Sequence, residues 1–397
     1  MASTSSYYSA NQSVLNEILF AATETWACPF DARVIVTVIG GGGGGGSANY
    51  NNAAASAVAA GGGSGAVCKS LLTVASGTSY VATVGAAGSY NSGDEEQGGT
   101  GGNTSWKVSG GSALLQANGG VGGTGQSSTT GNTPSATGGA GGAVGTTGNI
   151  FGVAGARGGS ASIQAYSGSG FHIAAGGGAA AGIFGLAHRG GDANCTTGGY
   201  NKCIAAGGGG VWGRGGDMVA LNGNGIEMSG AGGTAFGAGH DFSEASDRDW
   251  WGIGETPNSY TYNFKFRGMT LNYRVSSASA ETGLHTGQSQ SIFDGLWGVA
   301  GSVTSSAANS YPGPGGGGAG YHESIYYGSS SGAGGYVSPG IFGGGGGGSN
   351  KTGSSGTYGG TGSYGGGGGG AASYSSSDSY SGMGGGGLVV LSVVEYL

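Results

Sequence analysis

Four carboxylates lie within the short stretch HDFSEASDRDWW, at positions 240–251. Asp241, Glu244, Asp247 and Asp249 could supply the oxygen ligands that a calcium ion prefers. The stretch lacks the glycine and the terminal bidentate glutamate at the spacing of an EF-hand loop. We therefore interpret it as a solvated loop without a metal, and a calcium site is the alternative.

Other patterns that could carry catalysis are weak. The segment 328–332, GSSSG, matches a nucleophile elbow, but it lies in a serine-glycine tract with no predicted helix after it. Matches to G-x-G-x-x-G are inevitable with 103 glycines, and no G-x-x-x-x-G-K-[ST] occurs. The histidines lack metal-ligand spacing. We predict no enzyme, no catalytic residue and no cofactor. The five histidines are His172, His188, His240, His285 and His322.

The four cysteines leave two interpretations open. Cys28 and Cys68 sit near predicted strands, whereas Cys195 and Cys203 bracket the loop CTTGGYNKC. A disulfide across that loop is one alternative. Buried or loop thiols made in a reducing cytoplasm are the other.

Glycine dominates the chain, with 103 glycines in 397 residues and only 8% charged residues. Six prolines without a G-X-Y period exclude collagen, and disordered chains carry more charge. Ordering glycine costs conformational entropy, so backbone hydrogen bonds must compensate. Left-handed polyproline-II-type helices have no internal hydrogen bonds, and glycine lets them pack side by side and bond laterally. The glycine runs are therefore predicted to form a bundle of such helices.

Loops of another composition join these runs. The loops, such as SNKTGSSGTYGGTGSY and AASYSSSDSYSGM, are rich in serine, tyrosine and asparagine. A run with its flanks spans roughly 20 to 30 Å at about 3.1 Å per residue. The runs fall at 40–46, 61–63, 176–178, 207–210, 315–318, 343–348, 365–370 and 384–387.

Strand signals concentrate near the termini. Segment 33–39 alternates apolar and polar residues, and 66–74 and 78–84 are predicted to form a hairpin joined at Gly77. A second hairpin is expected at the SGG between 104–108 and 113–117, and LVVLSVVEYL follows the last glycine run. We predict an all-β, partly irregular fold. A small antiparallel β-sandwich takes the C-terminal strand back into its first sheet, and the bundle extends from it.

These residues carry a family resemblance. The segments TWACPFDARVIVTVIGGGGGGG, GAVCKSLLTVASGTSYVATVGAAG and GGGGLVVLSVV resemble the glycine-rich domain of bacteriophage tail-fibre and tail-tip proteins. The matching residues include Trp26, Pro29, Tyr80, Gly85 and Leu388, and the resemblance covers about residues 1–145 and 338–397. More loosely, the chain is similar to tip adhesins of long phage tail fibres, whose glycine helices display receptor-binding loops.

The resemblance implies a virion tail-fibre or tail-tip protein that binds a host receptor through its tyrosine and serine loops. Tyrosine gives large contact area with few rotatable bonds, as in antibody paratopes. The receptor would be a cell-surface glycan or an outer-surface protein, and other tail proteins and a homotrimer are further expected partners. The alternative is that these rings only cover glycine backbone. The candidate receptor-binding residues are Tyr321, Tyr326, Tyr327, Tyr358, Tyr364, Tyr374, Tyr380, Trp250, Trp251, Tyr260 and Tyr262.

The segment 236–312 departs from both patterns. In 258–277, NSYTYNFKFRGMTLNYRVSS, apolar residues alternate on both sides of Arg267 and Gly268, which predicts a hairpin with an aromatic face. Trp250, Trp251 and Trp297 flank it. We favour an oligomer contact or receptor binding for this face over packing against the bundle.

The predicted organisation has an attachment segment at 1–23, the sandwich and first glycine part at 24–145, and bundle and loops at 146–235. The aromatic insert (236–312), a second bundle part (313–387) and the last strand (388–397) follow. No signal peptide or membrane span is predicted, and a net charge of −7 argues against nucleic acid. The alternative functions are a purely structural virion fibre or capsid decoration and, third, an ice-binding protein.

Overall fold

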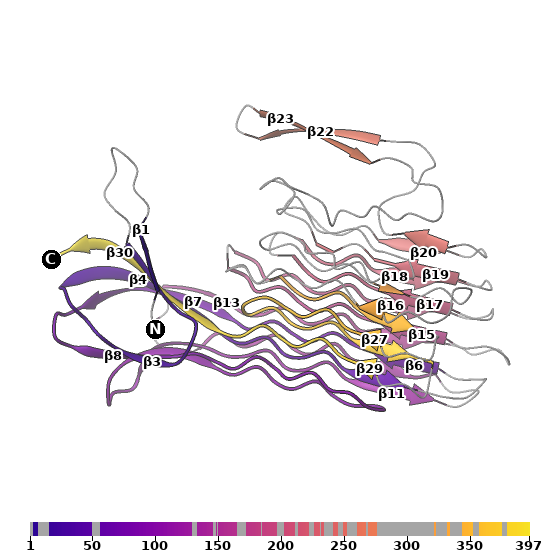
Figure 1. Ribbon diagram of the computed structural model, residues 1–397, viewed down its shortest axis with the longest axis horizontal. Coiled ribbons are helices and arrows are strands. Elements are labelled where there is room, and N and C mark those ends of the chain that lie inside the picture. Colours follow the sequence, from indigo (N-terminus) through magenta and orange to yellow (C-terminus); the bar gives the residue numbers. More distant parts are fainter. Residues whose placement is uncertain are drawn as a thin grey trace.

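The protein is seen here in a computed structural model whose described part is all-β. It describes residues 3–6, 16–49, 56–128, 133–145, 148, 150–164, 172–183, 185–196, 202–210, 213–221, 226–230, 232–233, 241–244, 249–251, 260–266, 269–275, 321–322, 332–333, 344–351, 357–374 and 379–397. These residues contain no helix, and so none that could cross a membrane. The chain forms a sandwich at one end, a long arm of glycine segments, and stacked short strands at the far end (Figure 1).

The first sheet of the sandwich is antiparallel, with the order β1-β2-β30-β4-β7-β13. Its central strand β4 (Ala32–Ile39) alternates as predicted, so that Val34, Val36 and Val38 are buried. The C-terminal strand β30 (Leu388–Tyr396) pairs with β4, which confirms its predicted return to the first sheet. The other strands are β1 (Ser3–Ser6), β2 (Asn16–Phe20), β7 (Val67–Val74) and β13 (Phe151–Val153).

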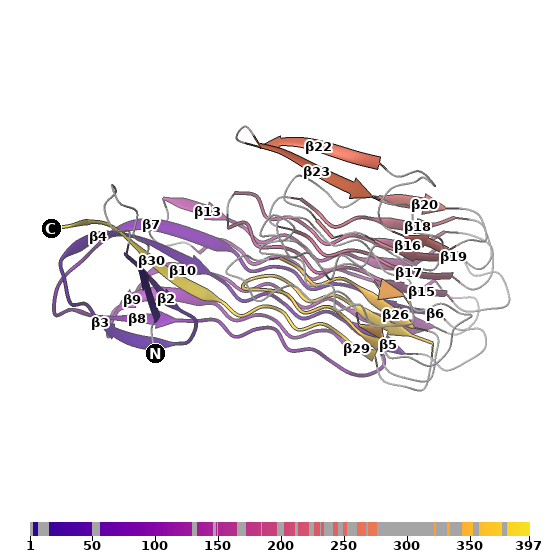
Figure 2. The same cartoon turned by 45° about the horizontal axis from the view of Figure 1, so that its top comes forward.

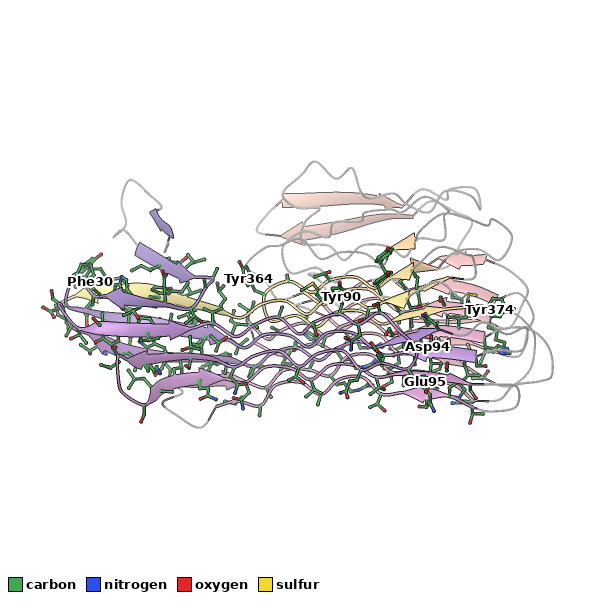
Figure 3. The ribbon with its side chains drawn as sticks, turned by 60° about the horizontal axis from the view of Figure 1, so that its bottom comes forward. Phe30, Tyr90, Asp94, Glu95, Tyr364 and Tyr374 are labelled. Carbon is green, nitrogen blue, oxygen red and sulfur yellow. The ribbon has the colours of Figure 1, made fainter. Side chains whose placement is uncertain are left out.

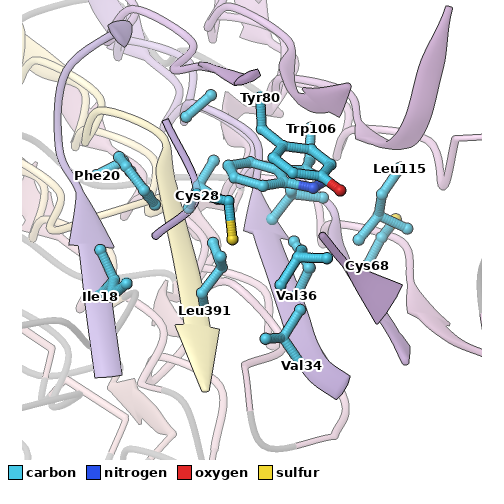
Figure 4. Packing of buried hydrophobic residues seen from close by; sticks show 14 of the residues in the cluster. Ile18, Phe20, Cys28, Val34, Val36, Cys68, Tyr80, Trp106, Leu115 and Leu391 are labelled. Atoms are coloured by element: carbon cyan, nitrogen blue, oxygen red, sulfur yellow. The ribbon is translucent and has the colours of Figure 1, made fainter. Parts of the chain in front are cut away.

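The second sheet packs on the first through an aromatic core. Trp106 is fully buried and stacks on Tyr80, with ring centroids 5.2 Å apart, and Phe20 from the first sheet reaches the same indole at 5.7 Å (Figure 4). Such rings bury large apolar areas, so this core holds the two sheets together. The strands, in sheet order, are β10 (Ala113–Ala117), β9 (Thr104–Val108), β8 (Ser79–Thr83) and β3 (Glu24–Ala27).

The two predicted glycine turns have different outcomes. Gly110 has a φ of 75° between β9 and β10, which pair antiparallel as predicted. Gly77 also has a φ of 75°, but β7 and β8 lie in opposite sheets, so the predicted hairpin is wrong. A tight turn, closed by the Thr78 amide on the Ala75 carbonyl at 3.1 Å, carries the chain across the sandwich instead. A glycine with positive φ therefore does not by itself distinguish a hairpin within one sheet from a turn between two sheets.

Glycine segments cross side by side from the sandwich to the far strands (Figure 2). In the run 40–46, the amides of Gly40 and Gly43 donate to the carbonyls of Ala66 and Gly63, both at distances under 3.0 Å. Amides three residues apart in the run therefore donate to the same antiparallel glycine segment. The amides between them donate to other neighbouring segments. The run donates to 60–66, 99–102 and 382–385, and it accepts from Gly88, 120–123 and 368–371.

The far end is a stack of four sheets of short, mostly parallel strands. Most strands that follow an outgoing glycine segment share sheets with one another, and most strands that precede a returning segment share the neighbouring sheets. In stacking order, the sheets contain first β25 (Gly332–Ala333), β27 (Thr357–Tyr358) and β29 (Ser379–Tyr380), then β24 (Tyr321–His322), β26 (Ser349–Lys351), β28 (Ala371–Ser373) and β5 (Ser47–Asn49).

The third sheet contains β11 (Gly125–Ser128), β6 (Ser56–Ala59), β15 (His172–Ala175), β17 (Lys202–Ala205), β19 (Ile226–Ser229) and β21 (Asp249–Trp251). The fourth contains β12 (Ser135–Ala136), β14 (Ala161–Ile163), β16 (Ala193–Cys195), β18 (Met218–Ala220) and β20 (Phe242–Glu244). Small buried residues such as Ala174 and Ala193 let these sheets pack closely. The sequence had predicted only loops at this end.

The predicted aromatic hairpin is confirmed. Strand β22 (Tyr260–Phe266) pairs antiparallel with β23 (Met269–Val275), with Tyr262 opposite Tyr273 and Phe264 opposite Leu271. Aromatic residues occupy alternate positions along β22, as the sequence pattern has them. The predicted turn residues Arg267 and Gly268 lie outside the described residues, as does Trp297.

Candidate functional site

Two candidate receptor-binding tyrosines meet on the first of the four stacked sheets. Strands β27 and β29 pair in register, so Tyr358 lies beside Tyr380 and their rings stack with centroids 4.8 Å apart and planes 7° apart. The preceding residues, Thr357 and Ser379, are buried on the other face of the sheet. The Thr357 hydroxyl shares a hydrogen bond of 2.6 Å with the Ser349 hydroxyl, and the Ser379 hydroxyl donates to the Ala48 carbonyl at 3.1 Å. Because side chains alternate along a strand, these inward bonds direct both tyrosines outward.

A third tyrosine joins them from the loop 90–97. The Tyr90 ring lies 6.3 Å from the Tyr380 ring, tilted by 55°. The loop is fixed beside β29 because the Asn91 amide donates to the Ser381 hydroxyl at 2.9 Å and the Ser381 amide donates to the Asn91 carbonyl at 3.0 Å. Tyr90 and Tyr358 are 48% and 38% exposed, so their rings reach solvent. Tyr90, Tyr358 and Tyr380 are called the tyrosine surface below.

Carboxylates follow Tyr90 in the same loop. Glu95 has a φ of 61° and its carboxylate accepts the Ser127 amide and hydroxyl at 3.0 and 2.9 Å, so the loop backbone is held in an unusual conformation. Asp94 and Glu96 on either side are exposed. Tyr90, Asp94 and Glu95 lie on one flank of the arm and its far end (Figure 3). The loop that contributes Tyr90 to the tyrosine surface is therefore acidic.

The remaining loop tyrosines do not join this surface. Tyr374 is half-buried and packs on small residues that include Ala48 and Ala372 at the far end. Tyr364 packs against Ile39 and Leu388 at the junction of sandwich and arm, far from Tyr374 (Figure 3). Both rings pack against apolar side chains of the scaffold and contribute to its packing.

Other sequence candidates are placed only by their backbone or not at all. Trp250 and Trp251 lie on β21, in register with Met228 and Ser229 of β19. Tyr260 and Tyr262 lie on β22, and Tyr321 begins β24. Tyr326 and Tyr327 lie outside the described residues.

Sequence reasoning missed a row of ion pairs on the fourth sheet. The segments ARGGS (156–160), HRGGD (188–192) and GRGGD (213–217) each lead into a strand of that sheet. We call the row Arg157-Asp192-Arg189-Asp217-Arg214-Asp241 the Arg–Asp ladder, because each arginine binds the aspartate of the next strand through both nitrogens. The recurring R-G-G-[SD] was the signal in the sequence that could have revealed it.

The ladder also fixes the backbone. The amides of Ser160, Asp192 and Asp217 donate to the carboxylate of the next strand at 2.7, 2.7 and 2.9 Å. Burial alone would raise the pKa of Asp241, but hydrogen bonds from Arg214 and the Asp217 amide outweigh it and hold that pKa below its usual value. The hydrogen bond to Asp192 raises the pKa of Arg157. These charge-assisted, bidentate contacts align neighbouring strands in one register.

The calcium alternative finds no support at Asp241, whose carboxylate is held by Arg214. Asp247 lies outside the described residues, and only the backbone of Glu244 and Asp249 is placed. In the described part of the chain, no three His, Cys, Asp or Glu residues gather as ligands of a metal ion.

All four cysteines are buried thiols, so the disulfide alternative for Cys195 and Cys203 is wrong. The two residues lie in different sheets, on β16 and β17. Burial raises the pKa of the Cys195 thiol to about 12, against an opposing effect of Lys202. Lys202 is itself buried and donates to the carbonyls of Thr196 and Leu221 at 3.2 and 2.6 Å, and burial lowers its pKa.

Comparison with known proteins identifies a family. Residues 20–253, more than half of the chain, match the model of a glycine-rich domain family. The chain belongs to this family. No curated protein matches it in sequence. The matched range contains most of the sandwich, the first glycine runs and the whole Arg–Asp ladder, whereas Tyr358 and Tyr380 lie beyond it.

Proposed function

We propose that the glycine segments are polyproline-II-type helices packed laterally into a rigid bundle. A helix with three residues per turn presents every third amide in the same direction. The bonds of Gly40, Gly43 and Gly46 to one neighbour, with intervening amides bonded to others, have this period. Gly365, with a φ of 73° beside the turn at Tyr364, is an exception.

Steric contacts support the same proposal. A Cβ added at Gly43 would lie under 3.0 Å from the carbonyl oxygen of Val121, and one at Gly345 would lie equally close to that of Gly178. Only glycine permits backbones this close. A high-resolution crystal structure should give φ near −75° for most residues of the runs, by the polyproline-II geometry. Extended β values with ordinary sheet pairing would contradict the bundle.

We propose further that the protein is a receptor-binding adhesin of a virion tail fibre or tail tip. The observation that carries this proposal is the tyrosine surface, whose three clustered rings lie on the far part of a long arm. The strands β2, β4 and β30 lie at the opposite end, in the sandwich, which leaves the far end to reach a target (Figure 1). Clustered exposed tyrosines on a rigid support are typical of recognition surfaces.

The proposed partners follow from this arrangement. The tyrosine surface would bind a host glycan or outer-surface protein, and the sandwich end would attach to other tail proteins. The hairpin β22–β23 has an aromatic face on which a second copy, in a trimer, or the receptor would pack. The protein would act on a virion after synthesis in the host cytoplasm.

Binding to whole cells tests the adhesin proposal. Fluorescently labelled protein should bind cells of a susceptible bacterial strain and reduce infection by the phage that carries it. The variant Tyr358→Ala should lose this binding, whereas Tyr396→Ala removes an exposed tyrosine of the sandwich end and should not. Equal binding by both variants would remove the tyrosine surface from the proposal. Replacing Trp250 and Trp251 by alanine, with folding, oligomer size and adsorption measured separately, tests the insert.

A purely structural virion component is the second candidate. The Arg–Asp ladder favours it, because Asp192, Asp217 and Asp241 recur at separations of 25 and 24 residues, as expected of a stiffening repeat. A structural component would assemble into particles and bind no cells. Loss of particle assembly in ladder variants, with no cell binding by the wild type, would favour this function over the adhesin.

A further inference from the structure

We propose that the tyrosine surface binds an uncharged glycan, with a sugar ring lying on the face of Tyr358. This inference rests on the adhesin proposal and names the class of its ligand.

Tyr358 lies at one end of the stacked rings of the tyrosine surface. One face of the Tyr358 ring is covered by Tyr380, at a centroid distance of 4.8 Å. On the other side, the residue in register on β25 is Ala333, whose side chain is a single methyl group. Among the described residues, no third ring continues the stack in that direction, and Tyr358 is 38% exposed. The face of the Tyr358 ring that points away from Tyr380 is therefore suited to stacking against a flat ligand ring.

A sugar ring fits the chemistry of such a position. The C–H bonds on one face of a pyranose are weakly positive, and the face of an aromatic ring is negative, so the two attract. The rest of the surface supplies hydrogen-bonding groups, because Asn91 and Ser92 lie beside β29 and Asp94 and Glu96 are exposed in the same loop. Carboxylates and amides can accept bonds from sugar hydroxyls.

Charge selects an uncharged ligand over an anionic one. Asp94, Glu95 and Glu96 lie four to six residues after Tyr90, and the loop 90–97 contains no lysine or arginine. The whole chain carries a net charge of −7. A phosphorylated or carboxylated polysaccharide would be repelled, since like charges in contact are unfavourable at low ionic strength. A protein receptor is less favoured because stable protein interfaces need a larger apolar centre than three tyrosines provide.

The anchoring of the surface reduces the entropy lost on binding. Tyr358 and Tyr380 are held by parallel pairing and by the inward bonds of Thr357 and Ser379, and the loop of Tyr90 is bonded to Ser381. A preorganised surface keeps more of its interaction energy as affinity. Weak single contacts can therefore give measurable binding to a repeating polysaccharide.

The test uses the full chain on immobilised mannan, dextran and chitotetraose, with heparin and polysialic acid as anionic probes. We expect binding to at least one uncharged probe, weakened roughly tenfold in Tyr358→Ala, as for loss of one aromatic contact. Tyr396→Ala should bind as the wild type does. Binding to no uncharged probe, binding to anionic probes alone, or an unchanged affinity of Tyr358→Ala would overturn the inference.

Whole cells separate this inference from the adhesin proposal. If labelled protein binds cells, periodate treatment of the cells, which cleaves vicinal diols of sugars, should abolish binding, and protease treatment should not. Binding that survives periodate and is lost after protease leaves the adhesin proposal standing and overturns the glycan. Absence of binding to any cells, with binding to an uncharged probe retained, contradicts the adhesin and leaves the ligand class standing.

Discussion

Arg189 holds both carboxylate oxygens of Asp217, through hydrogen bonds of 2.8 and 2.6 Å from its two terminal nitrogens. The same carboxylate accepts a bond from Arg214 at 2.8 Å and from the Asp192 amide at 2.7 Å. The Asp217 side chain thus joins two neighbouring strands, through its ion pairs with the arginines and through its hydrogen bond from the Asp192 backbone amide. The interaction is the central unit of the Arg–Asp ladder, and it sets the alignment of β16 with β18.

Replacing Asp217 by asparagine should destabilise the far end of the arm. Asparagine keeps the shape of the side chain but removes the negative charge that both Arg189 and Arg214 bind. We therefore expect a loss of about 1–3 kcal/mol in the free energy of unfolding. Urea denaturation followed by fluorescence measures it. The matched control is Glu395→Gln, which removes the exposed Arg33–Glu395 pair and should cost about 0–1 kcal/mol. Equal effects of the two variants would contradict a structural role of the ladder.

The ladder should also weaken in acid. The pKa of Asp241 is below its usual 3.8, since bonds from Arg214 outweigh the effect of burial. A lowered folded-state pKa stabilises the folded protein fully above the unfolded pKa, and this contribution disappears as pH falls through the folded value. The stability difference between the wild type and Asp241→Asn should therefore shrink below about pH 4. A difference that stays constant from pH 7 to pH 3 would contradict this assignment.

The four cysteines should resist alkylation in the folded protein. Each is buried, and burial raises the pKa of Cys195 to about 12, so little reactive thiolate forms. Iodoacetamide at pH 8 should label none of them rapidly in the native protein and all four in urea. Mass spectrometry counts the labels. Thiols that react before unfolding would show that these sheets open, and a pair that never reacts without reductant would indicate a disulfide.

The sequence predicted the parts of the fold where side chains determine structure. Val34, Val36 and Val38 alternate with exposed residues, so β4 was identified, and Gly110 was recognised in a hairpin turn. The stacked sheets were not predicted, because two- to four-residue strands such as β27 are too short for a periodic pattern. Their register depends on the glycine segments that lead into them, which carry no side chains, and in the fourth sheet also on the Arg–Asp ladder, whose partners are distant in sequence.

The candidate site was predicted in composition and not in arrangement. Tyr358 and Tyr380 were both selected for their loop context, and the structure brings them together with Tyr90, which was not selected. Tyr364 was grouped with them but lies at the junction with the sandwich. Arg189 and Asp217 are 28 residues apart in sequence, so their pairing depends on the return of the chain. Local sequence cannot place residues that distant segments bring together.

The glycine arm should tolerate side chains at some positions and reject them at others. A Cβ at Gly345 would lie under 3.0 Å from the Gly178 carbonyl oxygen, whereas nothing lies within 4 Å of one at Gly386. We expect Gly345→Val to cost about 3 kcal/mol or more, because a close-packed backbone cannot move aside for a branched side chain. Gly386→Ala should leave the free energy of unfolding unchanged or raise it by about 0.4–1 kcal/mol, by restricting the unfolded chain. Thermal unfolding of both variants measures the contrast, and a tolerated valine at Gly345 would show that the arm is loosely packed.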